Sequence, residues 1–392
     1  MLKLPHYALK VTPIDGTHPY IKEALRTRGV NEKCWCGSNR KYKKCHQKRG
    51  SERAATLGEL LHKTEEILWQ TRVCMHPNAG STTCSGGIID AHTIQRKGAL
   101  EKIIDSDNHV CVLKTDKKNA ANEESLKIET IGWKKASTFP GFCGKHDTML
   151  FTKIETTPFT GTHEQCVIQS YRALCNELYK KRSLVDTLLF QRENLDKGRD
   201  INIQIRCQLS TTENLKGQRQ SVKELEDLQP LYETAIQTGD FSAFQSVCFY
   251  FDGDFGIVST SIPHAEFAFD GKKVTDLWDL SVKGHAIAHS VMTTATGGAF
   301  FFCWEAECSE AQQVIDSFLA ISDELKPDIF VQYCFLNCEN TYFSRSWWDG
   351  LPVDSQKMLK KLMSLTYYEG GSFTQTPSGP LVEWKITGTA PK

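Results

Sequence analysis

Two groups of cysteine and histidine residues have the spacing of metal ligands. The tighter group lies within thirteen residues and consists of Cys34, Cys36, Cys45 and His46. Structural zinc sites take four such thiolate and imidazole ligands in a tetrahedron. Gly37 permits the tight turn that points two thiolates at one ion, and the neighbouring lysines favour ionised thiols. The sequence therefore predicts a zinc knuckle in this segment.

A second, more dispersed group of the same residue types lies in the central part of the chain. Its candidate ligands are Cys74, Cys84, Cys143 and His146. Cys143 and His146 have the spacing by which one helical turn presents two ligands to a metal. His76 is an alternative to either Cys74 or Cys84, so the choice among the five residues stays open. We expect a second structural zinc ion here, which gives two per chain.

The bulk composition places the protein among soluble chains. Of its 392 residues, 40% are hydrophobic and 24% are charged, and no apolar run approaches the roughly 20 residues that a membrane span requires. The amino-terminal residues lack the apolar core of a secretion signal, so we expect a cytoplasmic protein with no membrane partner. Fifteen cysteines in such a chain favour metal binding and reduced thiols over disulfides.

Positive charge is concentrated at the amino terminus although the formal net charge of the chain is zero. Residues 1–50 carry twelve Lys and Arg against three Asp and Glu, an excess of nine. Clustered cations of this kind suit a phosphate backbone or an acidic protein surface. A solvated basic tail is the alternative interpretation.

The chain exceeds the size at which single hydrophobic cores stop growing, about 250 to 300 residues, so several domains are expected. We predict an α+β multidomain protein in four parts. These are a basic segment with the zinc knuckle (1–52), a small zinc module (53–160), a helical hairpin (161–240) and an α+β domain (241–392) in which helices cover an antiparallel sheet.

Hydrophobic periodicity supplies the elements of the last two parts. Apolar residues at helical spacing predict helices over Glu164–Leu195 and Val222–Gln237, which pair antiparallel. The continuous apolar run Asp328–Leu336 predicts a strand. His285 and His289 flank an alternating segment, which predicts that both are strand residues facing one side of the sheet rather than helical metal ligands.

The knuckle resembles a known family. The run Cys34–His46 looks like the SEC-C motif, which occurs at the tail of the bacterial secretion ATPase and is appended to many other proteins. The resemblance implies zinc binding and a role in docking a partner or acting near the ribosome. The chain has no Gly-rich loop ending in Lys and Ser or Thr, so the ATPase activity does not carry over.

The central module resembles the treble-clef, ββα-metal type of HNH nuclease, in which a β-hairpin carries a catalytic histidine and the following helix carries metal ligands. Ala91–Ile94 stands at the first motif position and Cys143–Asp147 at the second. The resemblance implies that His92 is the general base that activates water and that Asp147 is a ligand of Mg or Mn.

Position 91 departs from that family. The acidic residue expected just before the base is Ala91, which cannot bind a metal, although Asp90 is adjacent. Segment 74–155 is also similar to bacterial proteins that carry SEC-C motifs. The leading hypothesis is a bacterial zinc protein that binds nucleic acid, DNA in preference to RNA, or cleaves it as an HNH-type endonuclease in defence against foreign DNA. The alternative is a noncatalytic zinc adaptor that docks a protein partner or the ribosome.

Overall fold

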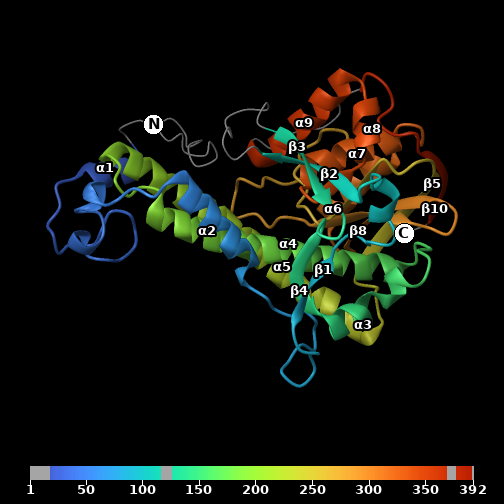
Figure 1. Cartoon of the computed structure of the whole chain (residues 1–392), viewed down its shortest axis with the longest axis horizontal. Coiled ribbons are helices and arrows are strands. Elements are labelled where there is room, and N and C mark those ends of the chain that lie inside the picture. Colours follow the sequence, from blue (N-terminus) through green and yellow to red (C-terminus); the bar gives the residue numbers. More distant parts are fainter. Residues whose placement is uncertain (1–17, 116–125, 369–376, 391–392) are drawn as a thin grey trace. The chain divides into compact units, whose positions relative to one another are not determined.

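The computed structural model describes residues 18–115, 126–368 and 377–390 (Figure 1). The chain divides into two compact units. Of the described residues, the first unit holds 18–71 and 180–222, and the second holds the rest. The amino-terminal residues behind the expectation of a cytoplasmic protein lie outside the described residues.

The first unit combines the knuckle with helices. It contains α1 (Pro19–Leu25), the short 3-10 turns η2 (Tyr42–Lys44) and η3 (Arg49–Ser51), α2 (Leu57–Gln70), and parts of α4 (His163–Asn194) and α5 (Ile201–Thr238). Helix α2 begins with a capping box, because Thr56 accepts from the Glu59 backbone N–H and Glu59 accepts from that of Thr56. The knuckle has its own small core, in which Ile21 and Trp35 pack with Ile205 of α5.

Helices α4 and α5 pair antiparallel, as the sequence predicts. In the first unit Arg192 and Gln208 exchange hydrogen bonds, and in the second the Tyr171 and Tyr232 rings lie 6.1 Å apart. The predicted start of the second helix at Val222 is wrong, because α5 begins at Ile201. Its first half is rich in polar residues, so the apolar stripe there is too sparse to register as periodicity.

The second unit is built on an eight-stranded sheet with the order β10-β5-β8-β7-β6-β9-β2-β3, and every neighbouring pair is antiparallel. Its strands are β2 (His109–Thr115), β3 (Leu126–Gly132), β5 (Phe244–Asp252), β6 (Ile257–Ser261), β7 (Ile287–Thr293), β8 (Gly298–Glu305), β9 (Thr341–Phe343) and β10 (Lys385–Ala390). Strands β1 (Ile88–His92) and β4 (Thr138–Cys143) form a separate two-stranded sheet.

Helices cover both faces of the large sheet, which explains why its central strands β6, β7 and β8 are buried at nearly every position. The helices after β8 are α6 (Ser309–Leu319), α7 (Lys326–Asn337), α8 (Arg345–Gly350) and α9 (Val353–Tyr368). Phe249 of β5 packs on Phe318 of α6. Ser246 lies three residues earlier in β5 and points to the opposite face of the sheet. Its Oγ lies 2.9 Å from Nδ1 of His163 in α4. The sheet is therefore the middle layer of this unit (Figure 1).

The predicted strand at Asp328–Leu336 is wrong, since these residues lie in α7. Nine of the twelve residues of α7 are buried. A helix that is buried on all sides carries apolar residues all round and shows no 3.6-residue period, so it cannot be told from a buried strand by pattern. The prediction that His285 is a strand residue on the same side of the sheet as His289 is also wrong, because β7 begins two residues after His285.

The coarse fold class is confirmed: the described residues combine helices with antiparallel sheets and a small cysteine-rich region. The four-part division of the chain stays a prediction. No helix within the described ranges is both long enough and apolar enough to cross a bilayer.

One buried histidine makes the fold sensitive to acid. His289 of β7 is fully buried, bonds Ser259 at 3.1 Å and packs against Phe330. Burial lowers the pKa of His289 to about 3. The unfolded chain takes up a proton near pH 6.5 and the folded chain does not, so this contribution to stability is complete above pH 6.5 and declines as the pH falls toward 3.

We expect His289→Gln to reduce the loss of unfolding free energy between pH 6 and 4 by about 1.4 kcal/mol per pH unit. Urea unfolding at several pH values measures this slope. The control is His62→Gln, because the side chain of His62 is 78% exposed. Identical slopes in wild type and both variants would contradict the assignment.

Candidate metal centres

The four knuckle residues converge on one point. The sulfur of Cys34 lies 3.2 Å from Nδ1 of His46, that of Cys45 lies 3.1 Å from the same nitrogen, and the sulfurs of Cys36 and Cys45 are 3.6 Å apart. Tetrahedral zinc with ordinary bond lengths separates its ligand atoms by roughly 3.5 to 3.8 Å. Three thiols and one imidazole at these separations fit a structural zinc ion.

Backbone geometry brings the knuckle ligands together. Gly37 and Asn39 both adopt positive φ, 75° and 58°, which turns the chain back on itself directly after Cys36. The Cys34 N–H donates to the carbonyl of Arg40, which closes the loop. The left-handed positions suit the glycine and the asparagine found there.

A buried carboxylate supports the knuckle from a distant part of the chain. Asp196, just beyond α4, accepts a hydrogen bond from Nε2 of His46 at 2.9 Å and others from Arg49 and Gln208 at 2.7 Å. Burial opposes ionisation of Asp196, but the hydrogen bond from His46 and the charge of Arg49 lower its pKa. A charged carboxylate on Nε2 leaves Nδ1 free for the metal and fixes the ring.

Sequence reasoning missed Asp196, and the sequence contains no signal for it. It stands 150 residues from His46, in a polar stretch between two helices. Only the folding of α4 and α5 onto the knuckle within the first unit brings this carboxylate to the histidine.

The second cluster also gathers its four residues. The sulfurs of Cys74 and Cys84 lie 3.3 and 3.6 Å from Nδ1 of His146, and Cys143 completes a group whose ligand atoms all lie within 4.8 Å of one another. Burial opposes ionisation of Cys143, but hydrogen bonds from backbone N–H groups, Ser85 first, lower its pKa to about 7. The donor set matches that of the knuckle and fits zinc equally well.

His76 lies beside this cluster. Its ring stacks on that of His146 with centroids 4.0 Å apart, and its Nδ1 accepts from the Asn78 N–H at 3.0 Å. Burial lowers the pKa of His76 to about 4, so the ring is neutral near pH 7. From the sequence, His76 is an alternative ligand to Cys74 or Cys84. In the structure the group of four is Cys74, Cys84, Cys143 and His146, and both cysteines lie close to Nδ1 of His146.

Strand pairing positions these ligands. Strand β1 pairs antiparallel with β4, with Ile88 opposite Cys143, and helix α3 (Gly144–Glu155) follows β4 directly. Cys143 is the residue before the helix and His146 lies in its first turn. The two cysteines that precede β1 therefore meet the two ligands that end β4 and start α3.

His92 lies at the end of β1, and Asp147 lies in the first turn of α3, so both belong to the small module that carries the second cluster. Within the described residues, Nε2 of His92 and Oδ1 of Asp147 are buried without a hydrogen-bond partner. Burial lowers the pKa of His92 to about 4, with a further contribution from Arg96, and burial raises the pKa of Asp147.

A buried arginine lies among these groups. Arg172 of α4 is fully buried, bonds Glu155 at 2.6 Å, lies 3.7 Å from Asp147 and stacks over the Phe151 ring at 3.8 Å. Its positive charge acts on both His92 and Asp147. Sequence reasoning missed Arg172, which lies within a predicted helix and carries no motif of its own.

Comparison with known proteins identifies one segment. Residues 31–48 match the SEC-C motif, in agreement with the resemblance seen in the sequence. No curated protein and no solved structure matches the chain.

We expect two zinc ions per chain in the wild type and one in Cys143→Ser, because zinc loses most of its affinity when one of four ligands is removed. Elemental analysis of the purified proteins measures both values. Cys303→Ser is the control, since Cys303 is a buried thiol outside both clusters. One zinc in both the wild type and Cys143→Ser would contradict the second centre.

Asp196→Asn is expected to weaken one of the two zinc ions about 10- to 100-fold, because the neutral amide no longer fixes and polarises His46. Competition with a colorimetric chelator measures the affinity. Asp186→Asn, at an exposed position in the same unit, serves as the control. Unchanged affinity for both ions in Asp196→Asn would show that the hydrogen bond does not support the metal.

Proposed function

We propose that segment 74–155 is a treble-clef zinc module of the HNH type that acts on nucleic acid. Two cysteines, a β-hairpin and a helix whose first turn carries the remaining two ligands follow one another in that order. The hairpin β1–β4 is closed by a long insertion that contains β2 and β3. This order of elements supports the proposal, and zinc is the ion that the donor set favours.

The observation that carries the proposal is a pair of buried atoms without a hydrogen-bond partner among the described residues, Nε2 of His92 and Oδ1 of Asp147, of which the second also lies 3.7 Å from the Arg172 guanidinium. Buried polar atoms normally have hydrogen-bond partners, so two such atoms without one in the same zinc module support a site that a ligand or ion completes. Asp147 would hold a divalent Mg or Mn ion, which when bound supplies charge stabilisation to a phosphate.

The protonation states of both residues suit hydrolysis. With its pKa lowered to about 4, His92 is neutral at pH 7 and can accept a proton from water on Nε2. Arg172 places a positive charge beside Asp147 and offers two further buried donors, Nε and Nη1, that have no partner within the described residues. A negatively charged substrate oxygen is the kind of acceptor to which such N–H groups donate.

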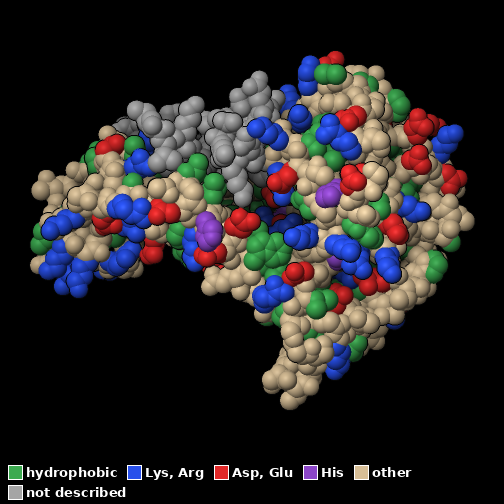
Figure 2. Space-filling model, in the orientation of Figure 1, with side chains coloured by type: hydrophobic (Ala, Val, Ile, Leu, Met, Phe, Trp, Pro, Cys, Tyr) green, Lys and Arg blue, Asp and Glu red, His purple; other side chains and the backbone are tan. Residues whose placement is uncertain are grey.

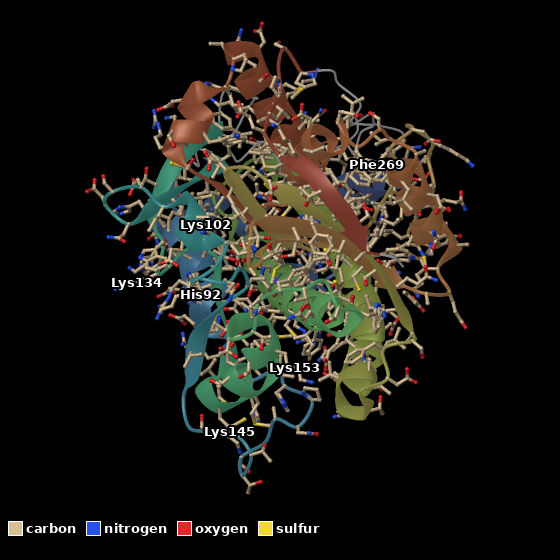
Figure 3. All side chains as sticks on the ribbon, turned by 90° about the vertical axis from the view of Figure 1, so that its right-hand side faces the viewer. His92, Lys102, Lys134, Lys145, Lys153 and Phe269 are labelled. Atoms are coloured by element: carbon tan, nitrogen blue, oxygen red, sulfur yellow. The ribbon has the colours of Figure 1, made fainter. Side chains whose placement is uncertain are left out.

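A basic surface adjoins His92. The guanidinium of Arg96 lies 5.7 Å from the Trp133 ring centre, and the backbone of Trp133 forms a hydrogen bond with His92. Lys97 follows Arg96, and Lys134 and Lys135 follow Trp133. All three are exposed, as is Lys102, and Figure 3 shows Lys102 and Lys134 on the same side of this view as His92. Cations interleaved with an aromatic ring are typical of nucleic-acid binding, and the resemblance to HNH nucleases favours DNA over RNA.

A noncatalytic adaptor is the second candidate, and one observation favours it. Ala91 is 2% exposed and cannot bind a metal, while the carboxylate of Asp90 is exposed and pairs with Arg72 at 2.9 Å. The acidic residue that the nuclease family uses before its base thus has no evident replacement in β1. In this reading both zinc centres hold surfaces for a protein partner or the ribosome.

The knuckle surface is the docking face in that second reading. Lysines at positions 33, 41, 43, 44 and 48 are exposed around the first zinc centre, and Figure 2 shows Lys and Arg side chains gathered over this segment. Such a surface attracts phosphates or acidic proteins without specific geometry. A role in defence against foreign DNA applies only to the nuclease reading.

We expect His92→Ala to lower the rate of DNA cleavage with magnesium or manganese at least about 100-fold, because a general base contributes about 10²- to 10⁴-fold. The unprotonated ring is the active form, so wild-type cleavage should persist down to about pH 5. His109→Ala is the control, since His109 is a partly exposed histidine in the same region.

Equal cleavage by His92→Ala and the wild type, measured on DNA and RNA, would end the nuclease proposal. Nucleic-acid binding is then measured at low and high salt. Salt-dependent binding without cleavage indicates a binding module. Absence of binding, with salt-insensitive copurification of one protein, indicates the adaptor.

A further inference from the structure

A third cluster of reactive side chains lies in the second unit and shares no residue with either zinc cluster. Cys308 immediately precedes α6, and its sulfur lies 2.9 Å from Nδ1 of His285. Glu310, in the first turn of α6, places a carboxylate oxygen 3.7 Å from Nε2 of His285 and 4.0 Å from the sulfur. Thiol, imidazole and carboxylate thus lie together where β7 begins and α6 starts.

The arrangement has one ligand fewer than each of the two zinc centres. A metal takes one nitrogen of a histidine, and the other nitrogen donates to an orienting group. Here three ligand atoms, from His285, Cys308 and Glu310, lie within 4.8 Å of one another, and the closest pair is the thiol on Nδ1 of His285, with Glu310 beside Nε2. The two zinc centres each gather four. The geometry is instead that of a thiol beside a base that a third group orients.

Cys308 is also singled out by exposure. All fifteen cysteines lie within the described residues. Six belong to the two zinc clusters, and the other eight besides Cys308 are buried: Cys111, Cys166, Cys175, Cys207, Cys248, Cys303, Cys334 and Cys338. Among the described residues, Cys308 is therefore the one partly exposed thiol outside the two zinc clusters.

A small polar cavity adjoins the thiol. Its volume is about 20 Å³, and it is lined by Cys308 and His285 together with Glu224, His264 and Lys283. A space of this size holds about one water molecule, for which roughly 10 to 15 Å³ is needed. It therefore has room for a small polar reagent beside the thiol.

We propose that Cys308 is a peroxide-reactive thiol, with His285 as its base and Glu310 as the residue that orients His285. His285 takes the thiol proton, and the sulfur attacks one oxygen of hydrogen peroxide. The O–O bond breaks, and the leaving hydroxide takes the proton from His285 to form water. The thiol is oxidised to sulfenic acid and the peroxide is reduced, so one thiol and one peroxide give one sulfenic acid and one water.

The base is needed because the thiol is neutral at rest. Burial raises the pKa of Cys308, and the carboxylates of Glu310 and Glu305 raise it further, against the hydrogen bond from the Ala311 N–H. The other charged groups at the cavity are Glu224, which faces His264, and Lys283, which pairs with Glu305. The thiolate, which is the nucleophile, forms when His285 accepts the proton.

The test uses the full-length, zinc-loaded protein with hydrogen peroxide and dimedone, which traps sulfenic acids, followed by peptide mass spectrometry. We expect the label at Cys308 and a labelling rate at least about tenfold lower in His285→Gln. His264→Gln is the matched control, because His264 lines the same cavity and should leave the rate unchanged. Zinc content and thermal midpoint show that each variant folds.

Cumene hydroperoxide, a bulky oxidant, should label Cys308 far more slowly than hydrogen peroxide. Four results would overturn the proposal: no label at Cys308, equal labelling in wild type and His285→Gln, equal losses in His285→Gln and His264→Gln, or equal rates with the two oxidants. A third zinc ion per chain that disappears in Cys308→Ser would assign the cluster to a metal instead. None of these readouts depends on His92.

Discussion

The second Cys/His cluster depends on the antiparallel pairing of β1 with β4. This pairing sets Ile88 opposite Cys143 and so brings the cysteines before β1 to the ligands at the start of α3. The same pairing places His92, at the end of β1, and Asp147, in the first turn of α3, in the same zinc module. A two-stranded ribbon is marginal on its own, and here the insertion between its strands joins the eight-stranded sheet, which anchors it.

Burial then decides the chemistry of each polar group. Burial and the charges of Arg96 and Arg172 lower the pKa of His92 and keep it neutral, whereas hydrogen bonds from His46 and Arg49 keep Asp196 charged in spite of its burial. The two residues differ because a buried group stays charged only where hydrogen-bond or charge partners replace the water it has lost. The two Cys/His clusters could each hold a metal ion, and a bound ion would fix six thiols that are otherwise free to react.

Periodicity was a sound guide where a helix or strand has one buried face and failed where burial is complete. The knuckle ligands, the start of α4 and the antiparallel character of the sheet follow from short-range spacing and alternation. Residues 328–336 were misassigned because α7 is buried on all sides, and α5 was shortened because its first half is polar. In both cases tertiary packing, which local sequence does not record, stabilises the helix.

The sequence by itself determined the residue types suited to metal binding and the local turns that present them, because Cys, His and Gly at short spacing act within one loop or one helical turn. Only the tertiary structure decided which distant groups join them. Asp196 reaches His46, Arg172 reaches Asp147 and Cys308 reaches His285 across 150, 25 and 23 residues of chain. Contacts at such separation depend on how helices and strands pack, and this packing is a property of the whole fold.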